Sequence, residues 1–252
     1  MGNVEQNLTL QHTVARYCPT APPCLQDPAI LKKLDVYANM LFETALPAGF
    51  IGQVSRETLN LRHILDSVLP LTNPSLLAAF AKDIKVCDLG TGAGLPGLPL
   101  AIALPDVQFF LADSASKRLN FVNEVVLNLQ LQNVKTIHCE ADDLSAHLDD
   151  VDLVTFRAFR KPLASLELAL QCTKIGAKAM YWRARPLDFS NPEVSKRLQS
   201  LGWSQPDFID FGEIGEIGNR GVHVFQRNSA SKAPYPRKFK KIRKEQLVVD
   251  FG

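Results

Sequence analysis

A glycine-rich stretch constrains the possible fold more than any other feature of the chain. Residues 84–97 read IKVCDLGTGAGLPG, in which a short apolar strand gives way to four glycines within eight residues. An apolar run at 98–104 follows and is stopped by Pro105. A strand, a glycine loop and a helix open the nucleotide-binding α/β folds, because glycine allows positive φ angles and lets a ligand approach the backbone closely.

The residues at the two ends of this loop narrow the class of ligand. A P-loop closes with Gly-Lys-Ser/Thr, whereas this loop closes with Leu95-Pro96-Gly97, which excludes a P-loop nucleotide site. Asp88 would repel a phosphate and instead favours a cationic or amine-bearing ligand. A dinucleotide oxidoreductase is an alternative, but S-adenosylmethionine, which carries a sulfonium cation and no phosphate, is the better match.

Strands and helices alternate along most of the chain. Periodicity predicts helices at 29–45, 57–71, 98–104, 115–129, 163–170 and 192–201, and strands at 84–89, 107–112, 134–139, 151–156, 176–181, 206–211 and 221–226. This order indicates an α/β, Rossmann-like seven-stranded sheet that is mostly parallel, with an antiparallel C-terminal hairpin and additional N-terminal helices. We expect one domain at 29–228, with a helical extension at 29–80, between an irregular lead-in at 1–28 and a basic tail at 229–252.

Composition bears on the compartment and on metal binding. The 252 residues are 46% apolar and 21% charged, as in ordinary soluble globular proteins. The sequence has neither the apolar run of about 18 residues that a membrane span needs nor the apolar core of a signal peptide. The five cysteines are scattered and form no C-x-x-C pair. We therefore expect a cytoplasmic protein with reduced thiols, no membrane partner and no metal.

Positive charge is concentrated near the C-terminus. Seven basic residues and no acidic one stand between Lys232 and Lys244, so the net charge of +2 becomes −5 without them. Aromatic residues alternate with the cations here, as in RNA-binding segments, although a solubilising tail is an alternative. The candidate RNA-binding residues of this tail are Arg237, Lys238, Lys240 and Lys241.

Charged residues also follow three of the predicted strands, where open α/β sheets bind their ligands. Asp113 ends the second strand, which is where doubly wound folds place the acid that binds ribose hydroxyls; a helix cap is the alternative. Asp142 follows the third strand and could accept a hydrogen bond from an adenine amine, or cap a helix. Arg157 ends the fourth strand, on the crevice side of the sheet.

Two further pairs of charged residues lie on predicted helices. His63 and Asp66 are three residues apart and share a helix face, where spacing alone favours a simple pairing of the two side chains. Lys117 and Arg118 stand in the first turn of a helix, where the helix dipole disfavours cations, which suggests an ionic partner.

The glycine loop, 88–97, resembles the first motif of class I methyltransferases. More narrowly, the chain resembles the RsmG (GidB) family, which methylates N7 of a guanine in the 530 loop of bacterial 16S ribosomal RNA. The segments that carry this resemblance are Tyr37–Leu41, Arg62–Ser67, Leu95–Gly97, Asp113–Phe121 and Arg157–Phe159. Two segments depart from the family pattern: Gly52–Ser55 stands where the family has Asn-Leu-Thr, and Ala141-Asp142 where it has a motif ending in Glu.

The resemblance implies roles for individual residues. It places the cofactor, S-adenosylmethionine, against Gly90, Leu95, Ala141, Asp142 and Arg157, with Asp113 at its ribose. Asp88, Gly92 and Gly94 are predicted cofactor residues from the glycine loop itself. The resemblance places His63, Asp66, Lys117 and Arg118 around the reaction pocket or the RNA path, with His63, Asp66 and Arg157 as positioning residues.

These roles amount to a prediction of mechanism. Guanine N7 is a lone-pair acceptor without a proton, so its methylation needs alignment rather than a general base. The implied partner is 16S ribosomal RNA or the small ribosomal subunit. A non-catalytic ribosome-assembly protein and a small-molecule methyltransferase are the alternatives.

Overall fold

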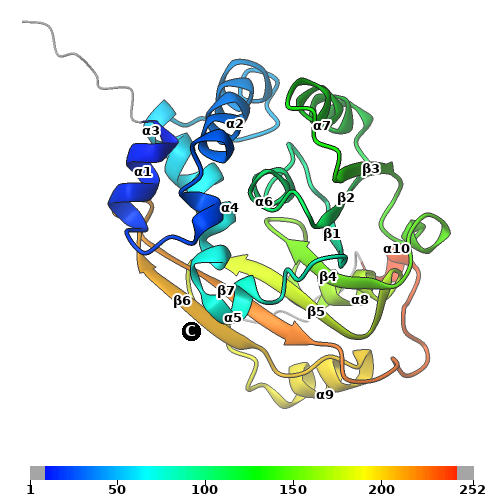
Figure 1. Cartoon of the computed structure of the whole chain (residues 1–252). Coiled ribbons are helices and arrows are strands. Elements are labelled where there is room, and N and C mark those ends of the chain that lie inside the picture. Colours follow the sequence, from blue (N-terminus) through cyan, green and yellow to red (C-terminus); the bar gives the residue numbers. More distant parts are fainter. Residues whose placement is uncertain (1–8, 243–252) are drawn as a thin grey trace, which may run out of the picture.

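A seven-stranded sheet forms the centre of the molecule (Figure 1), a computed structural model that describes residues 9–242. The strands are β1 Lys85–Leu89, β2 Gln108–Asp113, β3 Val134–His138, β4 Val151–Phe156, β5 Thr173–Arg183, β6 Asp207–Glu213 and β7 Asn219–Gln226. Their order in the sheet is β3-β2-β1-β4-β5-β7-β6, with β7 antiparallel to both of its neighbours. The predicted fold class is therefore confirmed, including the antiparallel C-terminal hairpin.

The strand order reverses between β1 and β4, which pair in parallel through Val86–Leu153, Cys87–Val154 and Asp88–Thr155. From β1 the chain continues outward to β2 and β3, and from β4 to β5. A crevice opens at such a switch point, beyond the carboxyl ends of the strands. The glycine loop after β1 and the segment after β4 are consequently neighbours at this edge.

Helices cover both faces of the sheet. Their bounds are α1 Leu10–Tyr17, α2 Pro28–Met40, α3 Arg56–Leu59, α4 Asp66–Val68, α5 Pro74–Leu77, α6 Gly97–Ala103, α7 Ser116–Asn128, α8 Pro162–Ala169, α9 Pro192–Leu201 and α10 Phe239–Ile242. A π-helical turn, Asn60–Leu65, joins α3 to α4, and a second one, Leu41–Ala45, extends α2. The expected helices at 29–45 and 57–71 are thus present as composite helices.

Alternating side chains of the strands enter two apolar clusters, one on each face. Phe109 and Trp182 belong to the cluster under the N-terminal helices, α6 and α7. Phe225 and Tyr181 belong to the cluster under α8, α9 and α10. Figure 1 shows the N-terminal helices, in blue and cyan, gathered beside α6, while α9 lies at the opposite side of the sheet.

The expectation of an irregular lead-in at 1–28 is wrong for residues 10–17, which form helix α1. Thr9 caps this helix by accepting a hydrogen bond from the backbone N–H of His12, and Leu10 and Val14 are buried. The Leu10 amide also donates to Asp35 Oδ1 at 2.9 Å. A short helix of this kind is stabilised by packing against α2 rather than by its own propensity, so sequence periodicity did not reveal it.

The basic tail begins as a segment packed on the second face of the sheet. Glu167 of α8, whose side chain is 1% exposed, accepts hydrogen bonds from Arg237 Nε at 2.9 Å and Nη2 at 2.7 Å. Ile242 is buried in the same apolar cluster. The prediction that Arg237 binds RNA is therefore corrected, because its guanidinium neutralises a buried carboxylate. Lys238, Lys240 and Lys241 are exposed, whereas Arg243 and Lys244 lie outside the described residues.

Within residues 9–242, the helices are all too short or too polar to cross a membrane. The same residues contain no group of three His, Cys, Asp or Glu side chains that could hold a metal ion.

Candidate active site

The glycine loop is held by hydrogen bonds from elements on both of its sides. Gly90, Gly92 and Gly94 have φ angles of 75°, 59° and 96°, in the left-handed region that favours glycine. The Gly92 amide donates to Asp113 Oδ2 at 2.8 Å, which ties the loop to the end of β2. Tyr37, fully buried on α2, donates its hydroxyl to the Ala93 carbonyl at 2.7 Å. The helical extension thus directly supports the loop.

Asp88 has a different role from the predicted one. Its carboxylate is buried beneath the loop and accepts hydrogen bonds from Thr91 Oγ1, Thr155 Oγ1 and the Gly97 amide at 2.6, 2.8 and 3.0 Å. Burial raises the pKa of Asp88 to about 6, although these hydrogen bonds oppose the rise. We correct the prediction that Asp88 contacts a cationic ligand: its oxygens are used to fasten β1, β4 and the loop together.

A pocket of about 250 Å3, here the glycine-loop pocket, opens beside the loop. It is lined by the ends of β1, β2 and β3, the first turn of α7 and the segment after β4. The lining residues are Leu89, Gly90, Ala112, Asp113, Ser114, Arg118, Cys139, Glu140, Ala141, Ala158, Phe159 and Arg160. The structure therefore brings together Gly90, Asp113 and Ala141 of the predicted cofactor residues. Arg118, predicted on the RNA side, also belongs to this lining.

Other predicted cofactor residues lie outside this lining. Leu95 is buried in the apolar cluster under the N-terminal helices. A Cβ on Gly94 would meet Leu98 Cδ1 at 2.3 Å, so Gly94 packs against the start of α6. Asp142 follows Ala141 and is half-buried, but it is not part of the pocket wall. Asp113 does not cap α7, whose N-cap is Ala115 without a side-chain cap; instead Asp113 Oδ1 accepts from the Ala115 amide at 2.8 Å.

A second pocket, of about 410 Å3, adjoins the first and is here called the arginine pocket. Its lining comes from the helical extension, β5, β7 and the segment after β4, namely Arg62, Asp66, Arg157, Ala158, Phe159, Arg160, Lys161, Tyr181, Trp182, Arg183, Ala184 and Arg220. The lining holds six basic side chains and, among the residues the structure describes, a single carboxylate. Ala158, Phe159 and Arg160 line both pockets and form the wall between them.

This shared wall was not predicted, although Phe159 lies close to the glycine loop. An ideal Cβ on Gly90 would lie only 2.1 Å from Phe159 Cδ2, so the ring occupies the space that glycine leaves open. The ring of Phe159 is parallel to that of Phe156, with centroids 6.4 Å apart, and the Arg160 guanidinium carbon lies 5.7 Å from its centroid. Ala158 has a φ of 53°, a left-handed value that is uncommon outside glycine.

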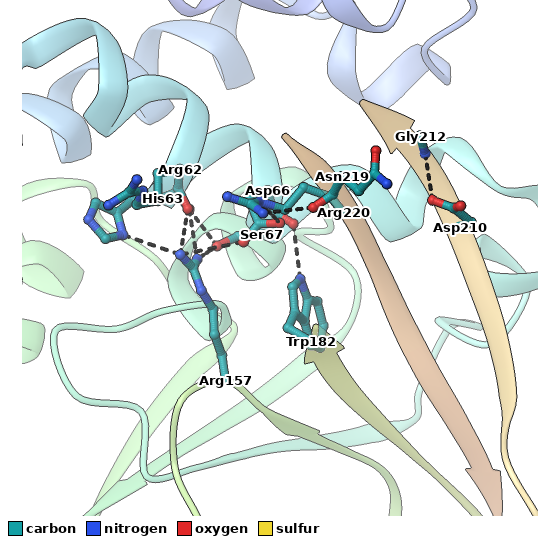
Figure 2. A network of polar contacts seen from close by, with 10 residues as sticks. All are labelled: Arg62, His63, Asp66, Ser67, Arg157, Trp182, Asp210, Gly212, Asn219 and Arg220. Carbon is teal, nitrogen blue, oxygen red and sulfur yellow. Dashed lines mark hydrogen bonds and ion pairs between the residues drawn. The ribbon is translucent and has the colours of Figure 1, made fainter. Parts of the chain in front are cut away.

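Arg157 connects the end of β4 to the helical extension (Figure 2). Its Nη1 donates to the His63 carbonyl at 3.2 Å and to Ser67 Oγ at 2.9 Å, and its Nη2 donates to the Arg62 carbonyl. Nη2 also lies 3.2 Å from His63 Nδ1 and 3.4 Å from Asp66 Oδ2. The structure thus places Arg157 in the arginine pocket, outside the lining of the glycine-loop pocket, as the main polar connection between helix and sheet.

Asp66 lies between two arginines of this network, Arg157 and Arg220 (Figure 2). Its Oδ1 is 3.5 Å from Arg220 Nε, and the Trp182 indole donates to its backbone carbonyl at 2.9 Å. Burial raises the pKa of Asp66, while Arg157, Arg220 and Arg62 oppose the rise. The simple pairing of His63 with Asp66 is therefore not what the structure shows, since both side chains contact Arg157.

His63 is neutral in this environment. Burial, together with Arg157 and Arg62, lowers the pKa of His63 to about 3. Its Nδ1 faces Arg157, and among the described residues its Nε2 has no hydrogen-bond partner. A group with so low a pKa is a poor general base at neutral pH, so the arrangement is suited to positioning.

Several residues of the arginine pocket could have been found from the sequence. Arg160 and Lys161 follow β4, and Arg183 is the last residue of β5, at the same edge as Arg157, so the rule that selected Arg157 applies to them too. Arg220, the second residue of β7, could not have been found in this way, because it reaches that edge only through the antiparallel pairing of β7 with β5. Lys117, by contrast, is exposed on the first turn of α7.

The sheet order and the crevice at its switch point define the fold, which is that of the class I methyltransferases. A putative O-methyltransferase from Klebsiella pneumoniae matches with a TM-score of 0.54 and 17% identity, over 86% of this chain and 96% of that chain. The apo form of the S-adenosylmethionine-dependent methyltransferase SibL matches with a TM-score of 0.53 and 16% identity, over 82% of this chain and 74% of that chain. At these identities the likeness shows the fold.

The family follows from the sequence comparisons. The family model GidB, described as rRNA small subunit methyltransferase G, matches residues 30–199. The ribosomal RNA small subunit methyltransferase G of Desulfitobacterium hafniense is 30% identical over 221 residues, 86% of this chain and 90% of that protein. Its namesake from Desulforamulus reducens is 32% identical over 212 residues, 80% of this chain and 84% of that protein. The chain belongs to this family, and the predicted family and enzyme class are confirmed.

Proposed function

We propose that this protein transfers the methyl group of S-adenosylmethionine to N7 of a guanine in the 530 loop of 16S ribosomal RNA. The observation that carries the proposal is the pair of adjoining pockets. One is built on the glycine loop and the other is lined by six basic side chains, and residues 158–160 line both. A cofactor in the first pocket and a polyanion in the second would meet at this wall.

The residues present fit S-adenosylmethionine in the glycine-loop pocket. The loop turns through three left-handed glycines, so backbone rather than side chains faces the pocket at Gly90. Asp113 supplies a carboxylate at the end of β2, where ribose hydroxyls would be bound. Ala141, after β3, presents a small apolar surface beside which an adenine would lie. When bound, this cofactor supplies an electrophilic methyl group.

The protein's own contribution is alignment. Guanine N7 needs no deprotonation, and His63, with its pKa lowered to about 3, is not set up to remove a proton. Arg157 holds the helical extension, and with it Arg62 and Asp66, against the carboxyl end of β4. Fixing the target in this way supplies proximity and orientation, which can account for a large part of a methyl-transfer rate.

The RNA partner and the compartment belong to the same proposal. The basic arginine pocket, exposed Lys117 and the exposed tail lysines Lys238, Lys240 and Lys241 are suited to contacts with RNA phosphates. The predicted partner is 16S ribosomal RNA or the small ribosomal subunit, and the predicted location is the cytoplasm, where that subunit is found.

A labelled-methyl assay tests the proposal. The protein is titrated with S-adenosylmethionine and then given naked 16S RNA, assembled small subunits or a metabolite mixture, each with methyl-labelled cofactor. We expect cofactor binding and label in the ribosomal RNA. Failure to bind the cofactor would favour a ribosome-assembly protein, and label only in metabolites would favour a small-molecule methyltransferase; either result rejects the proposal.

A further inference from the structure

One acidic side chain lines a pocket that is otherwise strongly basic. Asp66 is the single carboxylate among the described residues of the arginine-pocket lining. A pocket built only to attract phosphate would gain nothing from a carboxylate in its wall, because the acid weakens the attraction. The side chain is 10% exposed, so only a small part of the carboxylate reaches the pocket.

The carboxylate keeps capacity to accept hydrogen bonds. Its two oxygens lie 3.4 Å from Arg157 Nη2 and 3.5 Å from Arg220 Nε, both longer than the roughly 2.7–2.9 Å of charge-assisted hydrogen bonds. Its position is fixed nonetheless, because the Trp182 indole donates to the Asp66 backbone carbonyl at 2.9 Å. Figure 2 shows the carboxylate between the two guanidinium groups.

We propose that Asp66 selects guanine, by accepting hydrogen bonds from N1–H and the 2-amino group of the target base in the arginine pocket. This inference rests on the proposed function and extends it to base recognition. An ionised carboxylate can only accept hydrogen bonds, and a neighbouring arginine can only donate them. Together they offer two acceptors beside a donor, which complements the two donors and the O6 acceptor on the Watson–Crick edge of guanine.

The same pattern discriminates against adenine. Adenine presents an unprotonated N1 where guanine presents N1–H, so Asp66 would face a lone pair instead of a donor. Enzymes that act on flipped-out bases read the Watson–Crick edge in this way. Because N7 is not part of that edge, binding the edge leaves the N7 lone pair free to face the glycine-loop pocket.

The rest of the pocket suits a nucleotide. A volume of about 410 Å3 falls within the ~300–1,000 Å3 of small-ligand sites. Phe159 and Trp182 offer aromatic surface for a base, and Arg183 and Lys161 offer positive charge for its phosphate. Phe159 also lines the glycine-loop pocket, so a base packed against it would be next to the cofactor.

Nucleotide selectivity provides the test. Affinities for guanosine, inosine and adenosine 5′-monophosphates are measured by calorimetry, with S-adenosylhomocysteine present to prevent reaction. We expect guanosine monophosphate to bind at least about tenfold more tightly than adenosine monophosphate, since a base that leaves a buried polar group unpaired is disfavoured. Inosine monophosphate, which keeps N1–H but lacks the 2-amino group, should be intermediate.

The variant Asp66→Asn should lower the guanine-to-adenine affinity ratio at least about tenfold, because an amide can donate to the unprotonated N1 of adenine, whereas a carboxylate can only accept. Asp106→Asn, the same change at an exposed carboxylate outside both pocket linings, is the control and should leave the ratio unchanged. A merely structural Asp66 would weaken both nucleotides equally, and an unchanged ratio in Asp66→Asn therefore overturns the proposal.

Two further outcomes would also overturn the inference. One is the absence of nucleotide binding at millimolar concentration, and the other is equal binding of the three nucleotides by the unaltered protein. The second needs no variant, so the test stands even if Asp66→Asn fails to fold. If ribosomal RNA is methylated while selectivity does not depend on Asp66, only this inference fails. Absence of ribosomal RNA methylation would instead reject the proposed function.

Discussion

At the scale of single residues, Asp88 shows how a binding-site motif can serve the fold. Its carboxylate accepts hydrogen bonds from β4, from the loop and from the start of α6, and is buried at 1% exposure. The sequence indicated a specific role for this position, because an acidic residue in an apolar strand is unusual. Its orientation could not be inferred, since the partner Thr155 lies on a strand 67 residues away.

The raised pKa of Asp88 predicts a pH dependence of stability. Because the folded-state pKa, about 6, exceeds the ordinary value of 3.8, its contribution is greatest below that ordinary value and is lost as pH rises through 6. The loss is on the order of 3 kcal/mol at about 1.4 kcal/mol per pKa unit. In Asp88→Asn the free energy of unfolding, measured with urea between pH 4 and 7, should no longer show this part of its decrease with pH. Asp106→Asn, at an exposed carboxylate, is the control, and an unchanged slope in Asp88→Asn would refute the assignment.

At the scale of secondary-structure elements, strongly periodic segments were predictable. Strand β4 and helix α9 were predicted with the bounds that the structure shows. Helix α1 was missed because its stability comes from burial of Leu10 and Val14 against other helices. The anchored part of the tail was missed for a similar reason: the buried charge that holds Arg237 belongs to Glu167, on an element far away in sequence.

The junction between the glycine loop and α6 has no room for a side chain at Gly97. A Cβ on Gly97 would lie 2.3 Å from Leu111 Cδ2 and 2.8 Å from Asp88 Oδ2, in a buried position. We expect Gly97→Ala to lower the free energy of unfolding by about 1–3 kcal/mol, as overpacking does. Gly52→Ala, where a Cβ would meet nothing within 4 Å, should stay within about 0.5 kcal/mol of the unaltered protein. Equal stabilities of the two variants in urea would contradict this packing.

At the scale of the whole molecule, the site is made where the helical extension meets the sheet. The sequence supplied Arg157, His63 and Asp66 as separate candidates, and the structure joins them in one network. It did not supply Arg220, whose role depends on β7 inserting between β5 and β6. Strand order of that kind is set by tertiary packing rather than by any local signal.

This network predicts how Arg157 affects the reaction. In Arg157→Ala the helical extension loses its polar connection to β4, so the target should be misplaced and methyl transfer to small-subunit RNA should fall about 10²-fold. The affinity for S-adenosylmethionine, measured by calorimetry, should change little, because Arg157 is not part of the glycine-loop pocket lining. Transfer near the unaltered rate would remove Arg157 from the site.

The tail makes a separate prediction about RNA affinity. Replacing Lys238, Lys240 and Lys241 by Gln should reduce the salt dependence of RNA binding, by about 0.7 in the log–log slope for each phosphate of single-stranded RNA that the tail no longer neutralises. Arg237 stays in place, because its removal would leave Glu167 unpaired. The matched control replaces the exposed lysines Lys32, Lys33 and Lys82 by Gln. Equal slopes in both variants, measured by filter binding, would exclude the tail from the RNA interface.

The identity of the methylated nucleoside decides whether the protein methylates N7 of a guanine in the 530 loop. Small subunits are incubated with the protein and methyl-labelled S-adenosylmethionine, and their RNA is then digested and separated by mass spectrometry. We expect the label to be recovered as 7-methylguanosine from the 530-loop fragment of 16S RNA. Label in any other nucleoside, or none in the RNA of a protein that binds the cofactor, would contradict it.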